Sequence, residues 1–168
     1  ISEWGWLPLI IGLSVAEALS ELTGKEFLTK WPNDVLYEGK KVCGILCESN
    51  YGGVIAGIGI NVNFEKSELP VKNASAINLI TGSEAERELV LAATLRKISE
   101  NLRIWGESGV NSLADIYLKY SDTIGKEVRV ELGSGNTISA IAVGLSELGE
   151  LKLSNGSTVS IGDVTHLR

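Results

Sequence analysis

The stretch Lys30-Trp31-Pro32-Asn33-Asp34 decides how the rest of the chain is organised. The residues that lead into it, Phe27 to Lys30, form a short apolar-polar run that predicts a strand. Pro32 ends this strand because it has no backbone N–H to donate to a neighbouring strand. Asn33 and Asp34 are then expected in a turn, where a strand end displays their polar side chains.

The residues after this turn predict a β-hairpin and then a further strand. Val35 to Glu38 continue an extended run, Gly39-Lys40 is the predicted hairpin tip, and Lys41 to Cys47 return as a strand. Val54 to Asn61 is apolar at most positions, which favours a central strand that is covered on both faces.

Gly57 and Gly59 share one face of the strand predicted at Val54 to Asn61. Glycine weakens a strand unless something approaches the backbone closely at that position. Close packing against the helix predicted at residues 7–22 would explain both glycines, and so would a ligand that lies flat on the strand. Because these glycines occur beside the stretch around Lys41, we favour the ligand.

Residues 7–22 predict a helix with Pro8 in its first turn and Gly24 at its end. This segment is apolar, but an acidic residue precedes it where a signal peptide would carry basic ones. The chain contains no uncharged apolar run of about 18 residues, so we expect a core helix and no membrane span. The predicted buried stripe is Leu9, Leu13, Ala16 and Leu19.

Two further helices are predicted in the middle of the chain. Ser83 to Glu86 has the pattern of a capping box, which predicts a helix from there to about Trp105. A second helix is predicted from Val110 to Tyr120. The residues of the first helix that recur at helical spacing, and that we expect in the core, are Leu91, Leu95, Ile98, Leu102 and Trp105.

From about Asp122 the chain changes to short β-prone runs separated by Gly, Asn and Ser. Five short strands in fewer than about 50 residues predict a small barrel, which has too little core to stand alone and should dock on the rest. We therefore predict an α+β protein with a main domain at 1–121 and a small domain at 122–168. The predicted strands are Glu127–Glu131, Ile138–Leu145, Glu150–Leu153, Thr158–Ile161 and Val164–Leu167.

Composition excludes several functions. The net charge is −6, with 15 basic and 21 acidic side chains, which argues against general binding of nucleic acid. Cys43 and Cys47 lie about 13 Å apart along a strand, too far for a disulfide. His166 is the one histidine, so a zinc site is not expected either, and the thiols suit a reducing cytoplasm.

The chain starts at Ile1 and contains no methionine, so we expect a fragment.

Three motifs together resemble those of biotin protein ligases in order and spacing. They are Lys30-Trp31-Pro32-Asn33-Asp34, Lys41-x-x-Gly44-Ile45-Leu46 and Gly57-x-Gly59-Ile60-Asn61-Val62. The resemblance implies a biotin/lipoate ligase-like core, with the mixed sheet and helices of class II aminoacyl-tRNA synthetases. It also implies that the C-terminal barrel is an SH3-like domain.

The resemblance further implies a two-step reaction. Biotin and ATP first give biotinyl-AMP, with Mg²⁺ as the activating ion, and a lysine of a biotin carboxyl carrier protein then takes the biotin. Lys41 would be the catalytic cation because negative charge develops in both steps, whereas Lys40 would be only solvated. No protein-bound metal is expected. The residues implied to bind biotin or the adenylate are Asn33, Asp34, Lys41, Gly44, Ile45, Leu46, Gly57, Gly59 and Asn61.

Other interpretations of these residues stay open. Asn33 and Asp34 would orient ribose, phosphate or Mg²⁺, or else only shape the turn. Asn61 would bond the adenylate or simply finish its strand, and Trp31 would line the site or act as a buried anchor.

The ligases also carry a Gly/Arg-rich loop upstream of the matched region, and this chain has no such loop. We therefore expect weak activity from this chain alone. A non-catalytic binding protein and a lipoate protein ligase are the alternative functions, and a homodimer is compatible with each. The five arginines are Arg87, Arg96, Arg103, Arg129 and Arg168.

Overall fold

The computed structural model describes residues 4–69, 71–132 and 135–167; Ile1 and Arg168 lie outside these ranges. The helices are η1 (Trp4–Trp6, 3-10), α1 (Leu7–Thr23), η2 (Lys66–Glu68, 3-10), α2 (Ile77–Thr81), α3 (Arg87–Ser108) and α4 (Asn111–Tyr120). The strands are β1 (Leu28–Lys30), β2 (Asp34–Tyr37), β3 (Lys40–Asn50), β4 (Gly53–Ile60), β5 (Glu127–Glu131), β6 (Thr137–Leu145), β7 (Leu151–Leu153), β8 (Thr158–Val159) and β9 (Asp163–His166).

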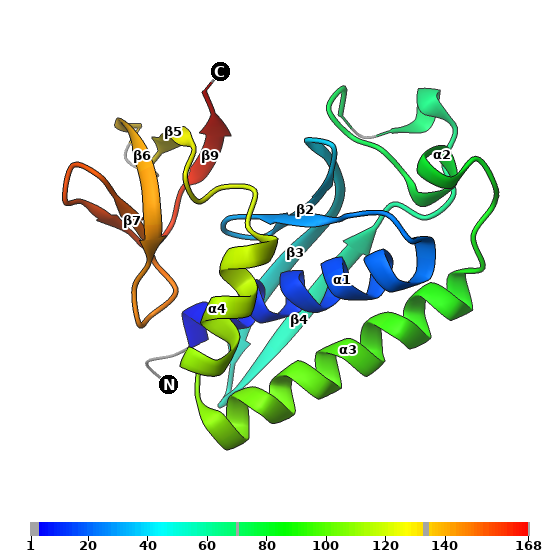
Figure 1. Ribbon diagram of the computed structural model, residues 1–168, viewed down its shortest axis with the longest axis horizontal. Coiled ribbons are helices and arrows are strands. Elements are labelled where there is room, and N and C mark those ends of the chain that lie inside the picture. Colours follow the sequence, from blue (N-terminus) through cyan, green and yellow to red (C-terminus); the bar gives the residue numbers. More distant parts are fainter. Residues whose placement is uncertain (1–3, 70, 133–134, 168) are drawn as a thin grey trace.

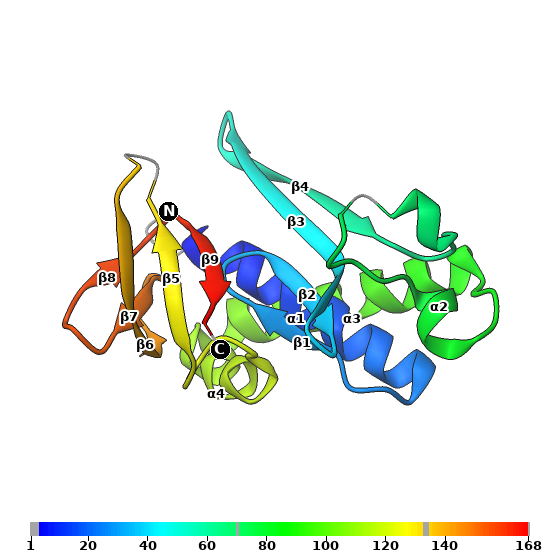
Figure 2. The same ribbon diagram turned by 90° about the horizontal axis from the view of Figure 1, so that it is seen from above.

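These elements form an α+β fold, as predicted, but the described strands of both sheets pair antiparallel, whereas a mixed sheet was expected. The first sheet has the strand order β1-β2-β3-β4, and α1 crosses in front of it with α3 alongside (Figure 1). The second sheet has the order β8-β7-β6-β5-β9 and lies beside the first (Figures 1 and 2). Within the described ranges, helices therefore cover one face of the first sheet and none covers the opposite face.

Helix α1 forms the centre of the core. The predicted stripe of Leu9, Leu13, Ala16 and Leu19 is buried, and the helix ends at Gly24, which has a φ of 66° and donates its N–H to Ser20 O. Within the described residues, Trp4–Thr23 is long and apolar enough to span a membrane by composition, but 61% of its most apolar window is buried inside the fold. The prediction of a core helix is confirmed.

The first hairpin differs from its prediction by one residue at two places. The turn consists of Glu38 and Gly39, which have φ values of 47° and 75°, and Lys40 already opens β3. Asp34 is not in a turn: it opens β2 and pairs with Lys30 on one side and Gly44 on the other. Local sequence does not show this, because the pairing partner of Asp34 comes from the returning strand.

The prediction of a central strand at Val54 to Asn61 is wrong. Strand β4 pairs only with β3 among the described residues, so it lies at the edge of the sheet, and most of its residues are exposed. Figure 2 shows the β3–β4 hairpin projecting past the helices. An apolar run looks like a strand buried on both faces, but here glycines occupy outward positions and Ile55 is 62% exposed.

Helix α3 begins later than the capping-box pattern predicts. Its N-cap is Glu86, and no side chain caps the helix there. Instead, the Asn63 side chain accepts from Ala85 N at 3.0 Å and donates to Ala85 O at 2.9 Å. An amide from a distant loop therefore satisfies the backbone that leads into the helix, and the predicted capping box is not formed.

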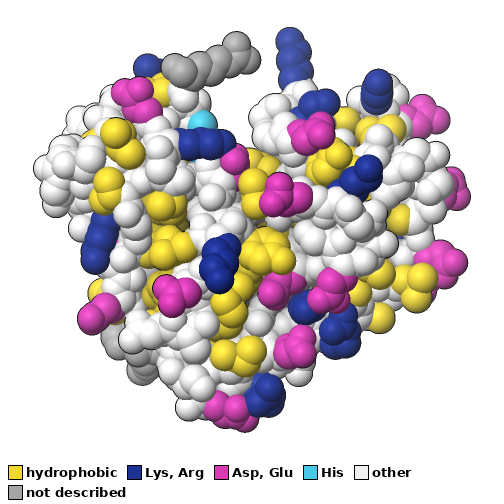
Figure 3. All heavy atoms as spheres, in the orientation of Figure 1, with side chains coloured by type: hydrophobic (Ala, Val, Ile, Leu, Met, Phe, Trp, Pro, Cys, Tyr) yellow, Lys and Arg dark blue, Asp and Glu magenta, His cyan; other side chains and the backbone are white. Residues whose placement is uncertain are grey.

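The core face of α3 is also different from the predicted one. Leu91 and Leu95 are 58% and 55% exposed, so their assignment to the core is wrong, whereas Ile98, Leu102 and Trp105 do pack against it. The stripe that faces α1 includes polar residues: Asn101 donates to Ser14 Oγ at 3.0 Å and to Glu17 Oε2 at 2.8 Å. Acidic and basic side chains are interspersed over the solvent side of α1 and α3 (Figure 3).

The C-terminal sheet docks on the main part, as expected. All five predicted strands are present, and their ends differ from the prediction by no more than two residues. One hydrophobic cluster joins the two parts. It contains Trp6, Leu9, Leu13 and Trp31 from the first part, Leu113 and Tyr117 from α4, and Val128, Val130, Leu151 and Val164 from the second. The division predicted at residues 121 and 122 falls between α4 and β5.

Candidate active site

The uncovered face of the first sheet carries a floor of glycines. Gly44 of β3 pairs with Gly59 of β4, and Leu46 pairs with Gly57. Side chains alternate between the two faces of a strand, so the intervening isoleucines point the other way, into the core under α1. Ile45 is one of these at 2% exposure, so its side chain does not lie on the glycine floor with the other predicted ligand residues.

In the part of the chain that the structure describes, no helix packs against Gly57 or Gly59. A Cβ added at Gly57 would meet only Leu46 O at 3.8 Å, and one added at Gly59 would meet only Gly44 O at 3.7 Å. Close packing against α1 therefore does not explain them. The surface above both glycines is open, and Leu46 beside them is 62% exposed.

Lys41 and Asp34 meet above Gly44. The Nζ of Lys41 lies 2.5 Å from Oδ1 of Asp34, with the two side chains 41% and 15% exposed. A Cβ added at Gly44 would lie 3.1 Å from both Cε and Nζ of Lys41. The resemblance implied that Gly44 binds biotin or the adenylate; in the structure, the group that approaches it is the lysine side chain.

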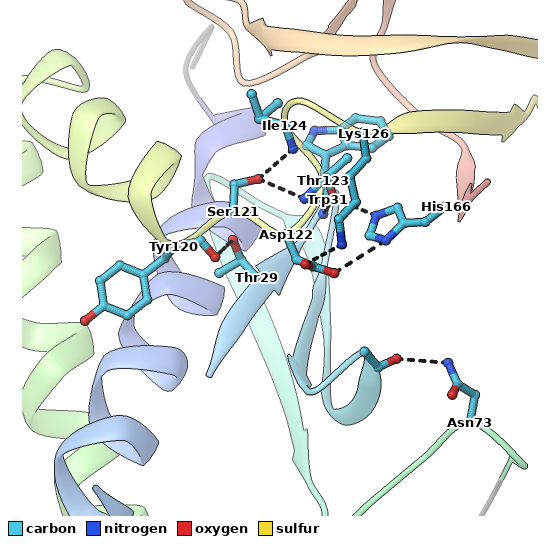
Figure 4. Close-up of polar contacts among 11 residues, drawn as sticks. Thr29, Trp31, Asn73, Tyr120, Ser121, Asp122, Thr123, Ile124, Lys126 and His166 are labelled. Atoms are coloured by element: carbon cyan, nitrogen blue, oxygen red, sulfur yellow. Dashed lines mark hydrogen bonds and ion pairs between the residues drawn. The ribbon is translucent and has the colours of Figure 1, made fainter. Parts of the chain in front are cut away.

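The backbone of Lys41 is held by a segment in which no functional residue was predicted. Lys41 N donates to Asn73 O at 2.9 Å, and Ser75 N donates to Lys41 O at 2.8 Å. The Asn73 side chain also donates to the carbonyl of the hairpin turn, Gly39 O, at 3.0 Å (Figure 4). Asn61 holds the same segment by donating to Ser75 O at 2.9 Å, so its amide group has a structural partner.

Asn33 and Trp31 both serve the local structure. Asn33 donates from its side chain to Ile45 O and accepts from Ile45 N at its carbonyl, each at 2.8 Å. This ties the turn to β3. Trp31 is 2% exposed and donates its indole N–H to Gly149 O at 3.0 Å, so it is a buried anchor. Lys40, by contrast, is exposed at the start of β3.

The two partners of the Lys41–Asp34 ion pair line different cavities. A groove of about 940 Å³ runs between the first sheet and the C-terminal sheet, with Asn33, Asp34 and Leu46 along one wall. A smaller cavity of about 300 Å³ is lined by Lys41, Gly44, Gly59 and Asn61. The groove also has charged residues that the sequence did not point to, namely Lys30, Glu131, Glu150 and Asp163.

The reactive groups of this region are a lysine ammonium and a thiol that stays neutral. Burial, together with Asp34, raises the pKa of Cys43 to about 12, so this thiol stays protonated. Among the described residues there is no group of three His, Cys, Asp or Glu side chains that could hold a metal ion. A lysine ammonium held by a carboxylate above an open glycine floor is suited to bind a carboxylate or phosphate.

Comparison with known protein families agrees with this geometry. Residues 7–65 match the Biotin/lipoate A/B protein ligase family, and residues 123–167 match the Biotin protein ligase C terminal domain. The first match contains the turn, Lys41 and both glycines of β4.

Individual relatives give the same result. The chain is 36% identical to the biotin–[acetyl-CoA-carboxylase] ligase of Mycobacterium tuberculosis, over all of this chain and 65% of that protein. It is 30% identical to the bifunctional ligase/repressor BirA of Bacillus subtilis, over 88% of this chain and 47% of that protein. This chain therefore spans less than two thirds of the length of either relative.

A solved structure matches over the whole chain. Biotin protein ligase from Aquifex aeolicus superposes with a TM-score of 0.87 at 38% identity, covering 100% of this chain and 77% of that one. A structure of the Aquifex enzyme in complex with biotin and ATP matches with a TM-score of 0.86.

Proposed function

Because this chain belongs to the biotin protein ligase family, we propose that it forms part of an enzyme that joins biotin to a lysine of a biotin carboxyl carrier protein, using ATP. The observation that carries the proposal is the ion pair of Lys41 and Asp34 above the open floor of Gly44, Gly57 and Gly59. This arrangement supplies one oriented cation beside a flat surface on which a planar ligand fits.

The proposed reaction has two steps. A carboxylate oxygen of biotin attacks the α-phosphorus of ATP, the bond to the β-phosphate breaks, and pyrophosphate leaves. The amine of the acceptor lysine then attacks the acyl carbon of biotinyl-AMP, which forms an amide and releases AMP and a proton. Negative charge gathers on phosphate oxygens in the first step and on the acyl oxygen in the second.

Lys41 is proposed as the catalytic cation of both steps. Its ammonium lies over Gly44 and lines the smaller cavity, while its partner Asp34 lines the groove, so a cation is available beside the glycine floor for a carboxylate or a phosphate. Asp34 fixes the lysine head without removing its access to solvent, since the lysine side chain is 41% exposed. Preorganised charge of this kind stabilises a transition state because it does not have to reorient during the reaction.

The remaining binding roles are also proposals. Gly57, Gly59 and Leu46 would form the surface under biotin or its adenylate. We propose Mg²⁺ only as an ion that arrives with ATP, since it prefers phosphate and carboxylate oxygens and keeps several waters. We propose a cytoplasmic enzyme without a membrane or nucleic-acid partner, and a homodimer is compatible with the open edge of β4.

The test uses the 168-residue chain and a non-hydrolysable analogue of biotinyl-AMP. Calorimetry should show saturable binding at one site, and Lys41→Ala should weaken it while the neighbouring variant Lys40→Ala should not. The same titration with the lipoyl analogue decides the substrate class. Equal binding by wild type and Lys41→Ala, or tighter binding of the lipoyl analogue, would contradict the proposal. Transfer of labelled biotin to a carrier domain then measures turnover.

A further inference from the structure

The turn that carries Asn33 is fixed by the C-terminal part of the chain rather than by its own sheet alone. Trp31 donates its backbone N–H to Thr123 Oγ1 at 3.0 Å and its indole N–H to Gly149 O at 3.0 Å. Thr123 is fully buried, and Trp31 is 2% exposed. Two groups from the far side of the interface therefore fix both the backbone and the side chain of Trp31.

The Thr123 hydroxyl belongs to a chain of hydrogen bonds. It accepts from Trp31, so its own proton needs an acceptor, and His166 Nε2 lies 3.3 Å away (Figure 4). His166 Nδ1 lies 3.4 Å from Asp122 Oδ2. Because an ionised carboxylate only accepts, the histidine proton belongs on Nδ1, which leaves Nε2 free to accept from Thr123.

Burial is the main factor that favours the neutral form of this histidine. Burial lowers the pKa of His166, and Lys126 and Lys30 lower it further, while Asp122 acts in the opposite direction. Lys126 also forms an ion pair with Asp122, with its Nζ 2.6 Å from Asp122 Oδ1, so the carboxylate of Asp122 interacts with both Lys126 and His166. Asp122 is itself tied to the first sheet, since its N–H donates to Thr29 O at 2.8 Å.

This chain of bonds reaches the candidate active site through the backbone. Asn33, two residues after Trp31, exchanges two hydrogen bonds with Ile45, and the next residue, Asp34, holds Lys41. A shift of the Trp31 backbone would therefore move the carboxylate that positions the lysine. A displacement of about 1 Å in a reacting constellation can cost about a hundredfold in rate.

We propose that Thr123 is a positioning residue: its hydroxyl connects His166 at the end of the C-terminal sheet to Trp31, and so sets Asp34 opposite Lys41. The connection itself is a property of the fold. Only its meaning for catalysis rests on the function proposed above.

The test compares Thr123→Val, which keeps the shape and loses the hydroxyl, with Thr123→Ser, which keeps the hydroxyl. Thr165→Val is the matched control, because Thr165 is exposed on β9. Amide hydrogen exchange is followed at Trp31, at Ile45 and in the middle of α1. We expect Thr123→Val to lose at least about tenfold protection at Trp31 and Ile45 only, and Thr123→Ser to restore it.

Two results would overturn the proposal. One is wild-type protection at Trp31 and Ile45 in Thr123→Val. The other is an equal loss of protection in α1, which would mean general destabilisation. Because exchange needs no substrate, this result is independent of whether the chain is a ligase. Where adenylate formation is measurable, Thr123→Val should lower kcat about tenfold with little change in the KM for biotin; a change in KM alone would also contradict positioning.

Discussion

Replacing Gly59 by alanine should affect the stability of the fold and the affinity for a ligand in opposite directions. The added methyl group would meet only Gly44 O at 3.7 Å, an ordinary contact, so the protein accommodates it without strain. Glycine in a strand costs about 0.5–1 kcal/mol relative to alanine because its unfolded state is freer. We therefore expect Gly59→Ala to raise the free energy of unfolding by up to about 1 kcal/mol, or the Tm by roughly 2–4 °C.

The same methyl group should harm binding. It projects from the floor of the cavity that also contains Lys41 and Asn61, into the space that the proposed ligand occupies. A loss of about 1.4 kcal/mol or more, which is a tenfold change in Kd, is expected for the biotinyl-AMP analogue. The assay pairs isothermal calorimetry with urea unfolding of the same protein samples.

The control is Gly106→Ala in α3, where an added Cβ meets nothing within 4 Å. It should stabilise the chain by a similar amount, since glycine inside a helix costs about 1 kcal/mol, and should leave binding unchanged. Wild-type affinity in Gly59→Ala would show that no ligand lies on this strand. Destabilisation by more than about 1 kcal/mol would show that the fold itself needs the glycine.

Three further predictions follow from other groups. Lys41→Ala should slow adenylate formation at least about a hundredfold in a pyrophosphate-release assay, while the free energy of unfolding changes by about 1 kcal/mol or less. Lys40→Ala is the control. Pyrophosphate release near the wild-type rate in Lys41→Ala would exclude Lys41 as the catalytic cation. The pKa of His166 is lowered in the folded chain, so the unfolded chain takes up the proton first as the pH falls through 6.5. Stability in urea should therefore decrease below that pH, and a His166→Asn variant with the same pH slope would refute this assignment. At about pH 8, iodoacetamide should modify Cys47 slowly and Cys43 only after unfolding, as measured by mass spectrometry. The reason is that burial raises the pKa of both thiols, and that of Cys43 to about 12. Labelling of Cys43 in the folded protein would contradict its burial.

Several features of the candidate site were predictable because they depend on neighbouring residues. Pro32 interrupts its strand because proline has no backbone N–H to donate. Side chains alternate between the two faces of a strand, so Gly57 and Gly59 share one face in any sheet. The position of Lys41 after a hairpin turn places it on the returning strand. These features needed no knowledge of what the rest of the chain does.

Other features of the site were not predictable, because they depend on partners that are remote in sequence. Asn73 and Ser75 hold the Lys41 backbone, yet they lie in a segment without periodicity. Thr123 and His166 fix the turn from more than 90 positions away. Polar residues in loops are common, so composition alone gives no reason to select these from the many others.

The sequence by itself determined the α+β class, the helix α1, the small C-terminal strands and the shared face of Gly57 and Gly59, because backbone chemistry and hydrophobic period set them locally. Only the tertiary structure decided that β4 is an edge strand, that Leu91 and Leu95 face solvent, and that the C-terminal part of the chain anchors Trp31. An apolar pattern records that a side chain can be buried, but the packing of distant segments determines whether anything covers it.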